Sequence, residues 1–380
     1  MLFFLVLVPF LGPAQAMAHD ASAYGGMFRS RSMGGSWLNA DVGLFLSAAL
    51  TVAVDPRDSN HLLMGSDSGL LASANGGRSW TREAPAQISG AVFAVAFSPD
   101  DTTVLCVAPG GVYREMGGSW RRSDAPTGAT PGRRIVFGEV PGRVYLLGRD
   151  RLFSSDDGGA HFIRVPSNAE GLETLAILHG QSETLFAVAH GGLMTSTDGG
   201  QDWRLRTVTG TTAPIETVIP DPEIAGRMWV AAANRLYVSS DGGGNWQAIG
   251  SSLPESHTVV RGIAADPTAT TLVVTTHRGT YRSTDAGAHW TLEEGNLPVH
   301  FEAGPLARDP TNPSILYVVY SLVPYPEVWR SALDGSNLLA RADPMSLIGG
   351  LAFLLLLSLC GVFLVAWMAR LRRDIPGTAR

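Results

Sequence analysis

One short motif recurs seven times along the chain and constrains the fold more than any other feature. Five copies follow the pattern Ser-x-Asp-x-Gly-x-x-Trp closely: SANGGRSW, SDDGGAHF, STDGGQDW, SSDGGGNW and STDAGAHW. In two weaker copies, SRSMGGSW and YREMGGSW, Ser32 and Glu115 stand where the Asp is expected. The final aromatic residues stand at positions 37, 80, 120, 162, 203, 246 and 290, which are 40 to 44 residues apart. A period this constant is typical of a repeat architecture.

The residues between successive motifs indicate β-structure. Each interval holds an apolar run such as ALTVAVDP (49–56), a turn, a second run such as TLVVTTH (271–277) and a third such as GTYRS (279–283). Short β-branched or aromatic runs separated by Gly, Pro, Asn and Asp predict strands joined by turns. Four strands in each unit predict an all-β fold built of propeller blades. No stretch before residue 345 shows sustained helical periodicity.

The residue types of the motif indicate a tight turn that closes on itself. Its Gly permits the positive φ that such a turn needs. Its Asp carboxylate can accept hydrogen bonds from backbone N–H groups of the same turn, and Asn75 can keep part of that role. Its aromatic residue can bury a large apolar face against the neighbouring sheet. We therefore interpret the motif as a structural staple and not as a catalytic site.

The motif resembles the Asp-box, or bacterial neuraminidase, repeat of β-propellers, and the resemblance covers about residues 25–335. It implies that each box links the third and fourth strands of a blade, on the rim away from any active centre. The structural residues that it assigns are Ser73, Asn75, Gly77, Trp80, Ser155, Asp157, Gly159, Phe162, Ser196, Asp198, Gly200, Trp203, Ser239, Asp241, Gly243, Trp246, Ser283, Asp285, Gly287 and Trp290.

The two ends of the repeat array predict how the ring closes. The array begins with GMFRSRSMGGSW, which supplies only a third and a fourth strand, and ends with GPLARDPTNPSILYVVY, which supplies a first and a second. One mixed blade, uniting residues near 28–40 with residues 304–320, therefore gives a ring of seven blades. The segment PEVWRSALDG (326–335) reads as a further third strand, which leaves an eight-bladed ring or an extra edge strand as the alternative.

Two apolar segments lie outside the predicted propeller. Residues 1–18 are apolar and end in A-x-A patterns, which indicates a signal peptide or an uncleaved N-terminal anchor. Residues 347–368 carry no charge, so residues 346–369 are expected to form a transmembrane helix in contact with the lipid bilayer. Arg370, Arg372 and Arg373 follow, and they predict a short basic cytoplasmic tail over 370–380. We expect a single-pass membrane protein with an extracytoplasmic propeller.

Composition gives no indication of a cofactor, metal or nucleic-acid site. The formal net charge of −6 does not favour nucleic-acid binding. The two cysteines, Cys106 and Cys360, lie in separate apolar segments and suggest no disulfide framework or thiolate metal site. The nine histidines show no metal-ligand spacing.

Three classes of function are compatible with a single Asp-box ring. Sialidases resemble this chain in the box, but the only near match to their Arg-Ile-Pro motif is IRVP, where Arg164 falls on an outer strand. Xyloglucanase-type hydrolases use two propellers, and this chain has the length of one. The photosystem II assembly-factor propellers look most similar, which favours a non-catalytic protein-binding scaffold with a membrane or envelope partner. A carbohydrate-binding module is the third class, with Trp229 and Trp329 as its candidate aromatic residues.

A local excess of arginine marks a candidate partner-binding surface. Two pairs, Arg121–Arg122 and Arg133–Arg134, flank SDAPTGATPG, which links one predicted blade to the next. Paired guanidinium groups suit carboxylates or phosphates, and a solvated charged loop is the alternative. We expect this loop to lie at a rim. Arg261 and Arg308 occur in inner-strand runs, where they could face the central channel or form ion pairs with Glu216 or Glu173.

Overall fold

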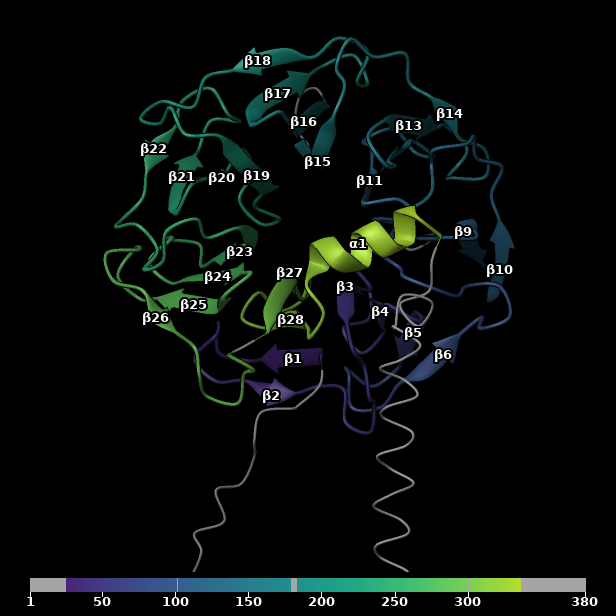
Figure 1. Cartoon of the computed structure of the whole chain (residues 1–380), viewed down its shortest axis with the longest axis horizontal. Helices are drawn as coiled ribbons and strands as arrows, with labels where there is room; N and C mark the ends of the chain where they lie inside the picture. The colour runs from purple at the N-terminus through teal and green to yellow at the C-terminus, as the bar shows by residue number, and fades with distance from the viewer. Residues whose placement is uncertain (1–24, 101, 179–182, 300, 336–380) are drawn as a thin grey trace, which may run out of the picture. The chain divides into compact units, whose positions relative to one another are not determined.

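Seven antiparallel sheets of four strands each form a ring in the computed structural model, which describes residues 25–100, 102–178, 183–299 and 301–335 (Figure 1). The first strands of successive blades contact one another and surround the axis of the ring. The predicted seven-bladed, all-β propeller is therefore confirmed. The eight-bladed alternative is wrong for the described residues.

Six blades use four consecutive strands each. Blade 1 contains β3 (Ala49–Val54), β4 (Leu62–Ser66), β5 (Gly69–Ser73) and β6 (Thr81–Glu83). Blade 2 contains β7 (Ala94–Phe97), β8 (Val104–Ala108), β9 (Gly111–Met116) and β10 (Ser119–Arg122). Blade 3 contains β11 (Arg134–Phe137), β12 (Val144–Leu147), β13 (Leu152–Ser155) and β14 (Ile163–Arg164).

The second half of the ring repeats this order. Blade 4 contains β15 (Leu172–Leu178), β16 (Thr184–Ala189), β17 (Gly192–Ser196) and β18 (Arg204–Arg206). Blade 5 contains β19 (Ile215–Pro220), β20 (Met228–Ala232), β21 (Arg235–Ser239) and β22 (Gln247–Ala248). Blade 6 contains β23 (Val260–Ala265), β24 (Leu272–Thr276), β25 (Gly279–Ser283) and β26 (Thr291–Leu292).

Blade 7 closes the ring with strands from both ends of the repeat array. Its first two strands are β27 (Glu302–Arg308) and β28 (Leu316–Ser321), and its last two are β1 (Gly26–Ser30) and β2 (Leu38–Asn39). Five consecutive residue pairs join β1 to β28, from Gly26 opposite Tyr320 to Ser30 opposite Leu316. The predicted mixed blade is therefore confirmed.

The segment read as a further third strand is a helix. Residues Tyr325–Leu333 form α1, which lies over the inner ends of the blades (Figure 1). Its apolar residues Val328 and Trp329 are buried against Leu50 and Phe93, which belong to blades 1 and 2. This helix forms although the sequence shows no sustained helical periodicity before residue 345. A nine-residue helix is too short to show sustained periodicity, and it is stabilised here by packing on the ring.

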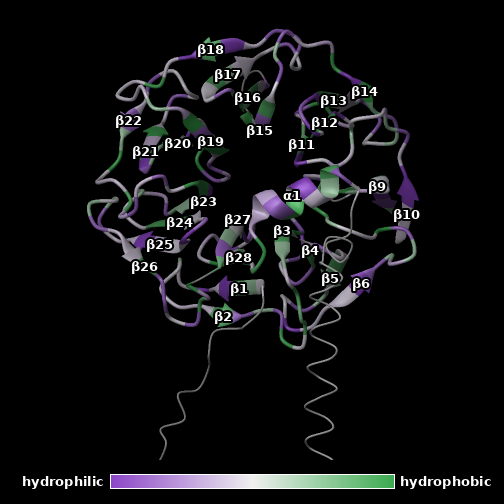
Figure 2. Ribbon diagram, viewed as in Figure 1, coloured by the Kyte–Doolittle hydropathy of each residue, from purple (hydrophilic) through white to green (hydrophobic). Residues whose placement is uncertain are grey.

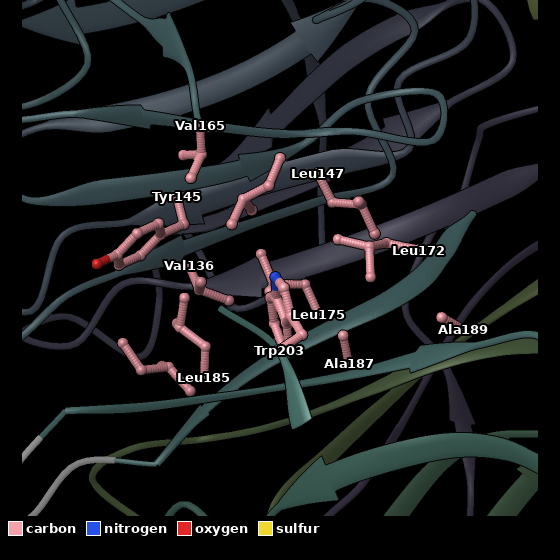
Figure 3. Close-up of a cluster of buried hydrophobic side chains, with 12 residues drawn as sticks. Val136, Tyr145, Leu147, Val165, Leu172, Leu175, Leu185, Ala187, Ala189 and Trp203 are labelled. Carbon is pink, nitrogen blue, oxygen red and sulfur yellow. The ribbon is translucent and has the colours of Figure 1, made fainter. Parts of the chain in front are cut away.

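The hydrophobic core lies between neighbouring blades. In the cluster of Figure 3, Tyr145 and Leu147 of blade 3 pack with Leu185 and Trp203 of blade 4. The aromatic residue of the box thus fills the space between two sheets, as predicted. Outermost strands such as β10 and β18 are hydrophilic by comparison (Figure 2). Because each sheet buries both faces against its neighbours, the ring needs no central hydrophobic core.

No helix among the described residues has the length and apolar character needed to cross a membrane. The predicted transmembrane segment, 346–369, and the segments 1–18 and 370–380 lie outside the described residues.

Candidate functional site

The box turns share one hydrogen-bond pattern. In blade 4 the Ser196 hydroxyl accepts from the buried Gly200 amide (2.9 Å) and donates to the Asp198 carboxylate (2.7 Å). Asp198 in turn accepts from the amides of Gln201 (3.1 Å) and Asp202 (3.0 Å). The same Ser–Asp–Gly contacts occur at Ser155, Asp157 and Gly159, at Ser239, Asp241 and Gly243, at Ser283, Asp285 and Gly287, and with Asn at Ser73, Asn75 and Gly77.

In several blades the box is also hydrogen-bonded to the turn between the first two strands of the same blade. In blade 5 the Gly242 amide donates to the Gly226 carbonyl (2.9 Å), in the turn between β19 and β20. The Asn245 amide, followed by the Asn245 side chain and Ser239, lowers the pKa of Asp241 to about 2. The donors to this carboxylate, Ser239 and Asn245, both belong to its own turn. This geometry supports the structural interpretation of the box.

The two weak copies behave as their sequences suggest. Ser30 keeps the bond from the Gly34 amide (2.9 Å), whereas the Ser32 hydroxyl forms a hydrogen bond with that of Ser36 (3.3 Å). In blade 2 the turn is a tight hairpin in which Met116 pairs with Ser119. The Glu115 carboxylate accepts there from the Gly118 amide. Neither substitute reproduces the turn that Asp forms.

We expect Ser196→Ala to lower the free energy of unfolding by about 1–3 kcal/mol, because the buried Gly200 amide loses its acceptor. Asp198→Ala should cost less, about 1 kcal/mol, since the carboxylate is solvent-exposed. Urea denaturation of both variants measures the difference. An Asp198 variant that is as stable as the unsubstituted protein yet fails to bind a partner would instead make the box a binding site.

Four of the seven inner strands carry an irregularity at their second residue. The strand registers of β3, β15, β19 and β23 shift by one residue, and the residues left over are Leu50, Glu173, Glu216 and Arg261. Such bulges re-aim a side chain. These residues lie at the end of the channel that α1 covers, because Leu50 packs on the helix. We call this end of the channel, with α1 and these residues, the channel mouth.

The structure separates the two arginine pairs. Arg121 and Arg122 lie exposed on β10, the outermost strand of blade 2. Arg133 and Arg134 lie at the start of β11 and line the channel mouth together with Arg261. The expectation that the loop between the two pairs lies at a rim is therefore wrong for its Arg133–Arg134 end. The linking loop runs from the outside of one blade to the axis at the next, so its two ends lie far apart.

A cavity of about 200 Å³ lies at the channel mouth. Its charged lining residues are Arg133, Arg134, Arg261 and Glu173, and Tyr325 and Trp329 of α1 contribute aromatic surface. The Nε atoms of Arg133 and Arg261 are buried and have no hydrogen-bond partner among the described residues. Desolvation lowers the pKa of the Arg133 and Arg261 guanidinium groups. Buried donors without acceptors favour binding of an oxyanion such as a carboxylate.

Two arginines near the mouth form ion pairs with glutamates. Arg261 forms an ion pair with Glu302 (2.7 Å), and Arg308 lies 3.6 Å from Glu223. Neither arginine pairs with Glu216 or Glu173, the partners suggested by the sequence. Arg261 does line the channel-mouth cavity, as the sequence allowed. Of the other candidates, Trp229 is buried in the core and Trp329 in α1 packs on Phe93.

Glu216 is a residue that the sequence did not single out as a perturbed group. Burial raises its pKa from 4.5 to about 7, and its Oε2 atom has no partner among the described residues. No group of three or more His, Cys, Asp or Glu side chains that could hold a metal ion occurs in the described ranges. The mouth therefore combines a neutralisable carboxyl group with a cluster of cations.

We expect Glu216→Gln to stabilise the protein at pH 8 and not at pH 4. Because folding raises the pKa of Glu216, its ionisation destabilises the folded state. This destabilisation is absent below the unfolded pKa near 4.5, grows as pH rises towards 7 and is constant above it. Because the side chain is half-buried, the gain is about 1–2 kcal/mol after allowance for solvent screening. Urea denaturation at pH 4, 6 and 8 checks it. An equal gain at all three values would contradict it.

No family model matches the chain. A xyloglucanase from a Paenibacillus species is 28% identical over 228 residues, which are 54% of this chain and 22% of the relative. The photosystem II assembly lipoprotein Ycf48 of Synechococcus sp. (strain CC9902) is 30% identical over 141 residues, which are 34% of this chain and 39% of the relative. The matches thus span less than half the length of either curated relative.

Solved structures show the same ring. The structure of YCF48 bound to D1 peptide superposes with a TM-score of 0.55 at 15% identity, over 82% of this chain and 98% of that one. The xyloglucanase of Xanthomonas campestris gives 0.53 at 17% identity, over 72% of this chain and 53% of that one. At these identities the similarity concerns the fold. The chain is a seven-bladed β-propeller that is structurally similar to Ycf48 and to xyloglucanase propellers.

Proposed function

We propose that the chain is a non-catalytic scaffold that binds an acidic, extended segment of a partner protein at the channel mouth. The observation that carries this proposal is the convergence of Arg133, Arg134 and Arg261 around one cavity, where two buried Nε atoms have no acceptor. A carboxylate entering the cavity would supply the missing acceptors. The YCF48 ring was solved with a D1 peptide bound, which supports a peptide ligand for a ring of this shape.

The proposal extends to a membrane setting. The uncharged segment 347–368, followed by three arginines, supports a single membrane span with the propeller on the extracytoplasmic side. A scaffold held at a bilayer would meet membrane or envelope proteins as partners. Protease protection of the chain in sealed membrane vesicles tests this part separately, because an extracytoplasmic propeller is cleaved only from that side.

Glycoside hydrolysis is the second candidate, and the xyloglucanase match over 228 residues favours it. We expect the detergent-solubilised chain to release no fluorophore from a panel of fluorogenic sialosides and β-glucosides.

The same solubilised chain should bind a fluorescein-labelled hexaglutamate peptide, and binding should weaken between about 50 and 500 mM NaCl because ionic strength screens charge pairs. Robust turnover of any glycoside would contradict the scaffold. Equal binding of a neutral hexaglutamine peptide would contradict the acidic ligand.

A further inference from the structure

Helix α1 touches the arginines of the channel mouth through its two aromatic residues. The guanidinium carbon of Arg133 lies 4.5 Å from the ring centroid of Trp329. The guanidinium carbon of Arg261 lies 4.8 Å from that of Tyr325. Both distances are within the range of a cation–π interaction, which is stronger where water is excluded. One helix therefore contacts two cations that belong to blades 3 and 6.

The helix is itself fixed to the ring on both sides. The Glu302 carboxylate of blade 7 accepts from the Tyr325 amide (2.8 Å) and from Arg261 (2.7 Å). The ring of Phe93 in blade 2 lies edge-on to both Tyr325 (5.0 Å) and Trp329 (4.9 Å). Because the aromatic rings are held from two directions, the guanidinium groups stacked on them lose freedom before any ligand arrives. Such preorganisation lowers the entropic cost of binding.

The helix also limits what can enter. It covers Leu50 and Phe93, the mouth residues of blades 1 and 2. The arginines and Glu173 of blades 3 to 6 line the cavity that remains. A cavity of about 200 Å³ holds a few side-chain groups and no folded domain.

We propose that α1 is the specificity element of the channel mouth, in which Trp329 and Tyr325 are positioning residues for Arg133 and Arg261. This inference rests on the proposed binding of an acidic segment and adds the residues that select it. The helix presents the guanidinium groups and restricts the ligand to an extended chain.

The test uses the full chain in detergent and the fluorescein-labelled hexaglutamate peptide, with the dissociation constant read by fluorescence anisotropy. We expect Trp329→Leu and Tyr325→Leu each to weaken binding by about 3- to 30-fold. Trp329→Phe keeps an aromatic face and should stay within about threefold, since the indole Nε1 has no partner among the described residues. Glu327→Gln, exposed on the same helix, is the matched control and should bind as the unsubstituted protein does.

Several outcomes distinguish the role of α1 from the proposed binding of an acidic segment at the channel mouth. If the Leu variants fold and bind as the unsubstituted protein does while Arg133→Ser binds weakly, the role of α1 is wrong and the binding site stands. If the unsubstituted protein does not bind hexaglutamate more tightly than hexaglutamine, both are wrong. If the Leu variants fail to fold, the dissociation constants of Trp329→Phe and Tyr325→Phe for hexaglutamate test the inference instead. A Trp329→Phe variant that loses as much affinity as Arg133→Ser overturns the inference, because stacking then does not explain the effect.

Discussion

Phe28→Ala is expected to lower the free energy of unfolding by about 3–5 kcal/mol, the usual cost of truncating a fully buried aromatic side chain. Phe28 lies in β1, the strand that the beginning of the repeat array contributes to blade 7, and it is 1% exposed. Its ring meets Tyr320 of β28 edge-on, with 5.5 Å between centroids. The substitution therefore leaves a cavity at the junction that closes the ring. Urea denaturation followed by circular dichroism measures the loss.

A control at an outer strand separates ring closure from general damage. Leu205 in β18 is 71% exposed, so Leu205→Ala should change stability by no more than about 0.5 kcal/mol. A Phe28→Ala variant that unfolds at the same urea concentration as the unsubstituted protein would contradict a closing role for the mixed blade.

Replacing Arg133, Arg134 and Arg261 together with Ser is expected to weaken binding of the hexaglutamate peptide at least tenfold. Each charge-assisted hydrogen bond contributes about 1.5–3 kcal/mol, and a tenfold change needs only about 1.4 kcal/mol. The remaining binding should depend less on NaCl, because fewer charge pairs are left to screen. Fluorescence anisotropy across a salt series measures both effects.

The chain offers its own matched control for this variant. Arg121 and Arg122 lie exposed on β10, outside the channel. The double variant Arg121→Ser and Arg122→Ser removes two cations near in sequence but outside the mouth, and it should bind within about twofold of the unsubstituted protein. If the double variant loses more affinity for hexaglutamate than the triple variant does, the peptide binds on the outside of blade 2 and not at the channel mouth.

The repeat spacing predicted most of the fold because the same turn motif marks the link between the last two strands of most blades. The period of 40 to 44 residues, the strand count and the mixed blade all follow from the boxes and the apolar runs between them. Helix α1 was missed because it is short and begins next to Pro326. A usable indication was present: Tyr325, Val328, Trp329 and Ala332 have the spacing of one helical face, and all four belong to the cluster that packs on the ring.

The channel mouth was harder to predict than the boxes. Box residues lie within eight positions of one another, whereas Arg133 and Arg261 are 128 positions apart. They line one cavity only because the ring brings their blades around a common axis. Sequence spacing also cannot show that a linking loop crosses from the outer strand of one blade to the axis of the next. That crossing is why Arg121 and Arg133 separate in space.

Arginines on the third strands connect each of three blades to the next in one direction. Arg29 of blade 7 donates to the carbonyl of Gly76 in the box of blade 1 (2.7 Å), and Arg282 of blade 6 donates to that of Met33 in the box of blade 7 (3.0 Å). Arg114 of blade 2 lies against Gly158 in the box of blade 3. The blades joined in this way are consequently not exchangeable modules, even though their strands follow the same sequence pattern. A blade transplanted into another ring would keep its own box but lose the arginine of the preceding blade that contacts the box. A graft should therefore begin at the third strand of the preceding blade.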